Sequence, residues 1–371
     1  MKASAYFESG NAANVKIEGT TVSFEARSHG SPQPLWFYFR VDELPEGAVT
    51  FVLRNAAACL GGLESFRVVR PVYSYNQIDW ERSDPGQIDP AAGTFTFRQQ
   101  FCQRSAYVAF CYPYTLTRLE RYLAQLREQP GVHVEILTRS PAGRPVYHVS
   151  LGHIETAHRT VWLTARNHAG ETPGSFVLEG FLEGALSNAD WARQLRRQAR
   201  IHAVPMVDVD GVVEGAYGKR RPPRDHGESW SDHTHLDVIR AIRRAIAAST
   251  GHAPYGLYLD LHAPTPAEGH YCYGVEPEQT SEKYRNDLAR FCHLLAQYAP
   301  PDSPFPADGA RSLYDGVRHS FHDQYHTHGV LSLALEASYH RVDSGDYVTP
   351  DSLRRFGAAV ARTVSEWLAE T

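Results

Sequence analysis

The chain has 371 residues and a formal net charge of −5, with 37 lysines and arginines against 42 acidic residues. This length allows two domains, each with a core of its own. The slight acidic excess is not the basic surface expected of a nucleic-acid-binding protein. No apolar run is long enough for a membrane-spanning helix, so we expect no membrane insertion.

The N-terminus and the cysteines indicate the compartment. Residues 1–8 lack the apolar segment of a secretory signal. The five cysteines are an odd number and show no paired spacing. Because disulfides are rare in reducing compartments, we expect a cytoplasmic protein with free thiols. The sequence does not specify the oligomeric state, and a homo-oligomer stays open.

Residues up to about 113 have the pattern of a small all-β unit. Short runs of alternating apolar and polar residues recur, separated by turn-forming stretches such as 45–47 and 84–86. The runs are 37–41, 49–53, 95–101 and 107–110. This spacing predicts an N-terminal antiparallel β-sandwich domain at residues 1–113.

Near residue 114 the hydrophobic period changes. Thr117 and Glu120 resemble a capping box, and Leu116, Leu119 and Leu123 recur at helical spacing. Strand-like runs then alternate with helical patterns. The runs are 133–138, 146–151, 160–165, 201–207, 257–262 and 330–337, and the helical patterns are 176–186, 236–248, 284–297 and 352–368. The alternation predicts an α/β domain at residues 114–371, with a mixed, largely parallel sheet flanked by helices.

Two histidines and a glutamate fall where such a domain binds ligands. His168 and Glu171 follow directly after an apolar strand-like run, and His262 ends another. Ligands in open α/β sheets gather at the carboxyl ends of the strands. Imidazole nitrogens and carboxylate oxygens are favoured ligands of zinc. A buried, hydrogen-bonded imidazole is the plain alternative for His262 taken singly.

A further carboxylate, Glu336, lies inside the apolar run 331–337. A buried charge is costly unless a metal or a proton-transfer role compensates for it. Taken singly, Glu336 is better explained as a salt-bridged core residue. Together with the two histidines and Glu171, it completes the parts of a zinc hydrolase: three ligands and one separate carboxylate.

At these positions the chain resembles a zinc carboxypeptidase, and more narrowly a cytosolic carboxypeptidase. Residues 204–212 are similar to the family's Pro-x-x-Asn-Pro-Asp-Gly strand and turn, with Asp208 and Val209 in place of Asn and Pro. Three upstream segments resemble the N-terminal β-sandwich of the cytosolic branch and the joint that follows it: 35–41, 70–74 and 109–115.

The resemblance implies roles for the residues at the strand ends. His168 and Glu171 match the family's first two zinc ligands, His262 matches the third, and Glu336 matches the general base. It therefore implies one Zn²⁺ per chain and hydrolysis of a peptide or amide substrate.

One departure affects substrate recognition. The family binds the terminal carboxylate of its substrate with an Asn-Arg pair inside a segment resembling Asp-x-Asn-Arg-x-Trp. At residues 225–230 the asparagine is replaced by Gly227 and the arginine by Glu228. A guanidinium that would bind a carboxylate with two hydrogen bonds is thus replaced by a negative charge that repels it. We therefore expect atypical recognition of the terminal group.

A basic loop precedes this segment. In the family an arginine of this region stabilises the oxyanion that forms during amide hydrolysis. Arg221 is the first choice for this role, followed by Arg220 and Lys219, and a solvated basic loop is the plain alternative. Asp225 is a candidate to orient a ligand histidine. Other residues considered are Tyr314, which matches the region of an assisting tyrosine, and the histidines at 319, 322, 326 and 328, which we expect to be exposed.

The predicted function is zinc-dependent hydrolysis of a peptide or amide bond, with the substrate left open. Glu228 could pair with an amine, which would favour basic or peptidoglycan-type peptides. Alternatively, Arg220 or Arg224 could supply the missing carboxylate clamp. The runner-up is an amidase or deacylase acting on N-acyl amino acids. A non-catalytic binding module is the remaining alternative, and zinc content would distinguish it.

Overall fold

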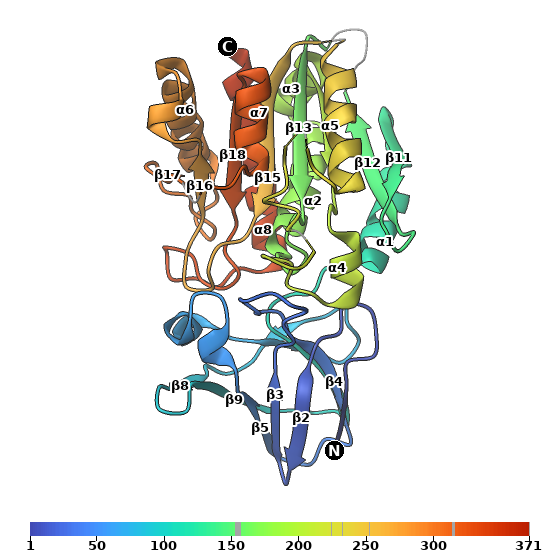
Figure 1. Ribbon diagram of the computed structural model, residues 1–371, viewed down its shortest axis with the longest axis vertical. Coiled ribbons are helices and arrows are strands. Elements are labelled where there is room, and N and C mark those ends of the chain that lie inside the picture. Colours follow the sequence, from blue (N-terminus) through green and yellow to red (C-terminus); the bar gives the residue numbers. More distant parts are fainter. Residues whose placement is uncertain (153–156, 224, 232, 252, 314–315, 371) are drawn as a thin grey trace.

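The computed structural model describes residues 1–152, 157–223, 225–231, 233–251, 253–313 and 316–370. The molecule is elongated, with a β-sandwich at one end and a larger α/β unit at the other (Figure 1). The N-terminus lies in the sandwich, and the C-terminus lies at the far end of the α/β unit (Figure 1). Among the described residues, no helix is both long and apolar enough to cross a lipid bilayer.

The sandwich consists of two five-stranded sheets, with strand orders β1-β4-β10-β6-β7 and β2-β3-β5-β9-β8. Alternate residues of β5 are buried, as expected for a strand that packs on one face only. The pair β3–β5 is parallel, whereas the other strand pairs of the sandwich are antiparallel. The strands are β1 (Lys2–Ser4), β2 (Ala13–Glu18), β3 (Thr21–Glu25), β4 (Tyr38–Asp42), β5 (Ala48–Leu53), β6 (Val72–Ser74), β7 (Glu81–Arg82), β8 (Gln87–Asp89), β9 (Thr94–Gln100) and β10 (Ser105–Ala109).

The α/β unit is built on an eight-stranded sheet of order β11-β12-β14-β13-β15-β18-β16-β17. The four central strands are parallel, and antiparallel pairs flank them. This arrangement confirms the predicted mixed, largely parallel sheet. The strands are β11 (Val132–Arg139), β12 (Pro145–Leu151), β13 (Arg159–Ala165), β14 (Ala199–Val204), β15 (Tyr255–His262), β16 (Tyr271–Gly274), β17 (Ala310–Ser312) and β18 (Leu331–Glu336).

Helices cover both faces of this sheet (Figure 1). Trp162 and Asp260 point to one face, where they bond to Ser249 of α5 and Ser320 of α7. On the other face α2 packs against β13, β15 and the long helix α8. The helices are α1 (Leu116–Leu126), α2 (Pro173–Leu186), α3 (Asp190–Gln198), α4 (Val209–Glu214), α5 (Asp237–Thr250), α6 (Glu282–Tyr298), α7 (Ser320–His328) and α8 (Pro350–Ala369).

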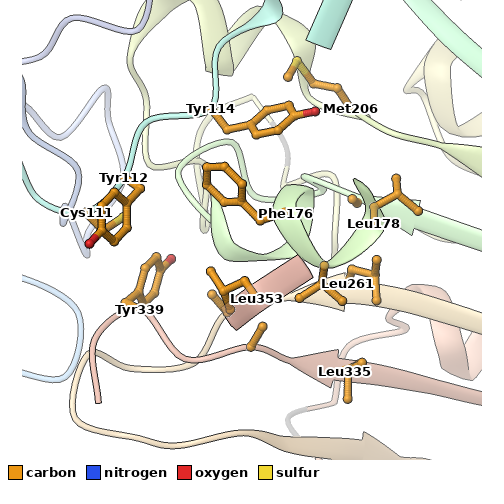
Figure 2. Packing of buried hydrophobic residues seen from close by; sticks show 14 of the residues in the cluster. Cys111, Tyr112, Tyr114, Phe176, Leu178, Met206, Leu261, Leu335, Tyr339 and Leu353 are labelled. Atoms are coloured by element: carbon orange, nitrogen blue, oxygen red, sulfur yellow. The ribbon is translucent and has the colours of Figure 1, made fainter. Parts of the chain in front are cut away.

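The segment that joins the two units is buried. Tyr112 and Tyr114 lie near Phe176 of α2 and Tyr339, which follows β18 (Figure 2). The rings of Tyr114 and Phe176 meet edge to face, with centroids 5.2 Å apart. The sandwich is therefore attached to the core of the α/β unit, beside the chain that leaves β18.

Three local expectations were wrong. Helix α1 is capped by Thr115, whose side chain accepts a hydrogen bond from Arg118 N, and not by a box that begins at Thr117. Strand β14 ends at Val204, because the chain then turns toward α4. His322 is buried against Glu276 because residues 320–328 form a helix that packs on the sheet.

Candidate metal centre

The predicted ligands meet because parallel strands end at the same edge of the sheet. Strands β13 and β15 are neighbours with Ala165 opposite Leu261, so the turn after β13 lies beside the end of β15. Strand β18 pairs with β15 on its other side, which places Glu336 opposite His262. The strand register thus brings together residues that are distant in the sequence.

His168, Glu171 and His262 form a compact, buried group. One ligand atom from each lies within 4.8 Å of the others. Nδ1 of His168 lies 2.9 Å from Glu171 Oε1, and Nδ1 of His262 lies 2.7 Å from Glu171 Oε2. Both imidazoles therefore present the same nitrogen to a shared carboxylate.

A second carboxylate stands behind each imidazole. Asp225 Oδ1 lies 3.1 Å from His168 Nε2, and Asp260 Oδ2 lies 2.9 Å from His262 Nε2. A carboxylate that accepts a hydrogen bond from Nε2–H keeps that proton on Nε2, so the neutral imidazole has its lone pair on Nδ1, where a metal would bind. Two inward lone pairs beside a buried carboxylate are the donor set of a catalytic zinc, and these residues fit that ion.

Asp260 is itself held firmly. It is fully buried and accepts hydrogen bonds from Thr164 Oγ1 and Asn167 Nδ2 at 2.9 Å and 2.8 Å, and a further bond from Ser320 Oγ. Asp260 lies two residues before His262 on the same strand face, and this spacing is the sequence signal for a residue that orients the ligand.

Glu336 lies beside the ligands but bonds to none of them. It is buried, and its Oε2 atom has no hydrogen-bond partner in the described structure. Burial raises the pKa of this carboxyl to about 7, and the nearby charge of Glu171 acts in the same direction. A carboxyl group with a pKa near neutrality can both accept and release a proton.

The three cations of the basic loop lie in different surroundings. Arg221 donates to both oxygens of Asp208, at 2.7 and 2.9 Å, so its guanidinium is occupied away from the ligands. Arg220 Nε lies 3.4 Å from Glu228 Oε1. Lys219 is half-buried, and burial alone would lower the pKa of its ammonium group. The negative charges of Glu171 and, after it, Glu336 outweigh this effect, so the pKa of Lys219 is raised overall. Among the loop cations that the structure describes, Lys219 is thus the one that has the carboxylates of the metal centre as its electrostatic neighbours.

Two glycines bring this loop close to the ligands. Gly218 has φ +103°, and a Cβ built on it would lie 2.4 Å from Ala169 N. A Cβ on Gly227 would lie 2.8 Å from His168 Nε2. An asparagine at Gly227 would therefore collide with the pair formed by His168 and Asp225 unless the loop moved outward.

Two residues predicted for the site, Tyr314 and Arg224, lie outside the described residues, so nothing is said of their positions. One residue that sequence reasoning missed is Tyr217, whose buried hydroxyl lies 3.5 Å from Glu171 Oε1 and 3.4 Å from Tyr339 Oη. With 20 tyrosines in the chain, no sequence signal distinguished it.

Comparison with known proteins agrees with this geometry. Residues 3–111 match the family described as "Cytosolic carboxypeptidase N-terminal domain", and residues 119–228 match "Zinc carboxypeptidase". An uncharacterized protein of Zymomonas mobilis is 27% identical, over 81% of this chain and 77% of its own. Cytosolic carboxypeptidase 3 of Bos taurus is 29% identical, over 81% of this chain and 33% of its own, so this chain spans about a third of that relative.

A solved structure shows the same fold over the whole chain. The metallo-carboxypeptidase from Burkholderia cenocepacia superimposes with a TM-score of 0.87 at 23% identity, covering 100% of this chain and 99% of the other. This likeness shows the fold. The two family matches together cover more than half of the chain, so the chain belongs to the zinc carboxypeptidase family, in the branch whose zinc carboxypeptidase domain follows a cytosolic carboxypeptidase N-terminal domain.

Proposed function

We propose that this protein hydrolyses a peptide or amide bond with one zinc ion held by His168, Glu171 and His262. The observation that carries the proposal is the pair of imidazoles that each present Nδ1 to Glu171 and each rest on a carboxylate through Nε2. A protein kept only for binding has no need of such a donor set, nor of an unpaired carboxyl group beside it.

Zinc, when bound, polarises a carbonyl group and lowers the pKa of a water molecule toward about 7. Glu336 is placed to accept the proton of the attacking water at its unpartnered Oε2 and then to deliver it to the leaving amine. Its raised pKa suits both steps, because a group that titrates near neutrality gives up a proton as readily as it takes one.

We assign stabilisation of the oxyanion to Lys219 in preference to Arg221 or Arg220. The carboxylates of Glu171 and Glu336 raise the pKa of the ammonium group despite its burial, whereas the two arginines are paired with Asp208 and Glu228. A preorganised donor aimed at the developing negative charge lowers the barrier. Assignment of this role to Lys219 also explains why the loop approaches so closely at Gly218.

Recognition of the substrate's terminal group follows from the same loop. Gly227 and Glu228 provide no guanidinium, and the guanidinium of Arg220 is paired with Glu228. We therefore propose that a free terminal carboxylate is not required of the substrate. Basic or peptidoglycan-type peptides, and N-acyl amino acids, are the substrate classes to compare.

The names of the bovine and other relatives call them cytosolic. We propose a cytoplasmic location for this chain too, which agrees with its five free cysteines.

The role of Glu336 is tested by Glu336→Gln. The substitution keeps the size of the side chain but removes the proton acceptor, so kcat should fall by at least about 100-fold while zinc stays near one per chain. Metal analysis and turnover of a mixed peptide library, followed by mass spectrometry, measure both. Glu276→Gln, which alters a buried glutamate that pairs with His322, is the matched control and should keep its activity. Undiminished turnover in Glu336→Gln would refute the assignment.

The assignment of Lys219 is tested by Lys219→Met, which keeps the length of the side chain and removes its charge. Loss of an oxyanion donor should reduce kcat by about 100- to 1,000-fold with zinc retained. In Arg221→Met, kcat should stay within about tenfold of wild type. That variant should instead lose about 1–3 kcal/mol of unfolding free energy, because buried Asp208 loses both hydrogen bonds from the guanidinium and keeps the one from Gly211 N. The reverse pattern, with Arg221 essential to kcat and Lys219 dispensable, would contradict the assignment.

The carboxylate behind His262 is tested by Asp260→Asn. An amide can donate to Nε2, which would move the imidazole proton to Nδ1 and remove the lone pair that faces Glu171. Zinc affinity, measured by competition with a chromophoric chelator, should fall about 10- to 100-fold. Ser320→Ala removes one bond to Asp260 but keeps the carboxylate, and should change the affinity much less. Wild-type affinity in Asp260→Asn would show that the carboxylate does not set the tautomer.

Terminal-group recognition is tested with pairs of peptides that end in a carboxylate or a carboxamide. Since Arg221 is paired with Asp208 and Arg220 with Glu228, kcat/KM should agree within a few-fold for each pair. A preference of about 100-fold for the free carboxylate would instead indicate a clamp supplied by an arginine. Turnover confined to N-acyl amino acids would support the amidase reading.

A further inference from the structure

We propose that the β-sandwich positions part of the active site, because it fixes the backbone of the segment that carries Lys219. This inference rests on the proposed function, and it gives the N-terminal domain a role that neither the sequence nor the comparisons assign. The positioning residue is Ser31, which lies in the loop between β3 and β4.

Four backbone carbonyls between residues 212 and 219 accept hydrogen bonds from the sandwich. Ser9 donates to two of them, through Oγ to Val212 O at 2.7 Å and through N to Val213 O at 2.9 Å. Asn11 Nδ2 donates to Gly215 O at 2.6 Å, and Ser31 Oγ donates to the carbonyl of Lys219 at 2.6 Å. In Figure 1 the end of α4, where this segment begins, lies against the sandwich.

The donors are themselves rigid. The amide side chain of Asn11 is bonded to the backbone of Arg27 through both its oxygen and its nitrogen. Ser31 is buried, and its hydroxyl also accepts a hydrogen bond from Gln33 N at 3.1 Å. The hydroxyl proton of Ser31 is therefore directed at Lys219, and the bond has little freedom to rearrange.

The anchored segment reaches the metal centre at two points. Tyr217 contacts Glu171, and Gly218, directly before Lys219, packs on the backbone of His168 and Ala169. The carboxylates of Glu171 and Glu336 raise the pKa of Lys219 despite its burial. The α/β unit holds the Tyr217 backbone itself, because Gly170 N donates to Tyr217 O at 2.6 Å. Among the residues that the structure describes, Ser31 provides the one hydrogen bond to the backbone of Lys219. Loss of that bond should release Lys219 more than Tyr217.

The same loop of the sandwich also contacts Pro222, three residues after Lys219. Gly30 has φ +83°, and a Cβ built on it would lie 3.0 Å from two ring carbons of Pro222. The loop at residues 28–31 therefore packs on Pro222 while Ser31 binds Lys219. The sandwich thus supports the basic loop from both sides of Arg220.

The test is Ser31→Ala, with Ser105→Ala as matched control. Ser105 also donates a 2.6 Å hydrogen bond, but to Asp42 within the sandwich. Ser31→Ala should lower kcat about tenfold and leave KM within about twofold, because a misplaced donor affects the transition state more than substrate binding. Zinc content should not change. Ser105→Ala should keep the wild-type kcat.

A second measurement does not depend on activity. Trypsin should cleave the native zinc-loaded Ser31→Ala protein after Lys219 or Arg220 faster than wild type or Ser105→Ala, with the cut identified by mass spectrometry. Equal cleavage in all three proteins would overturn the anchoring role, and faster cleavage with unchanged kcat would overturn its link to catalysis. If wild type hydrolyses no substrate, the proposed function fails, but the cleavage rates still decide whether Ser31 anchors the loop.

Discussion

The burial of the Glu171 carboxylate between two imidazoles is the interaction on which the other features of the site depend. A buried charge is tolerated only where partners or a metal compensate for it. The partners here are the two imidazoles, which donate to Glu171 from Nδ1 and would exchange those protons for a bound zinc ion, and Asp225 and Asp260 orient the rings from behind. The parallel strands β13, β15 and β18 supply the positions, because their carboxyl ends share one edge of the sheet.

The close approach of the basic loop has consequences for the substrate. At Gly227 the backbone packs against the pair of His168 and Asp225, so the position at which the family resemblance implies an asparagine has no room for a side chain. The next position, Glu228, pairs with Arg220. The absence of the Asn-Arg pair thus accompanies a loop that packs directly on the metal ligands, and this packing supports the proposal of a different terminal-group recognition.

Much of the fold and the donor set was predictable, because both depend on local patterns. Strands β13, β15 and β18 are apolar runs with a ligand or base at the end, and parallel strands bring such ends together. Three of the helices, α3, α4 and α7, carried no apolar repeat strong enough to be recognised. The sequence also did not decide which cation of the basic loop acts at the metal centre. The choice between Lys219 and Arg221 depends on Asp208, which holds Arg221 through a contact that spacing does not reveal.

The choice of lysine explains why the sandwich takes part. An arginine carries a planar fork that is preorganised for its partner, whereas a lysine is a point charge on a flexible stem. Placing that charge over the substrate costs conformational entropy, about 1–2 kcal/mol per backbone residue and up to about 2 kcal/mol for the side chain. A backbone already fixed by Ser31 and by the packing of Pro222 on Gly30 removes the first of these costs at Lys219. The use of lysine in this loop and the contact with the N-terminal sheets are therefore linked, and a change in either should require a change in the other.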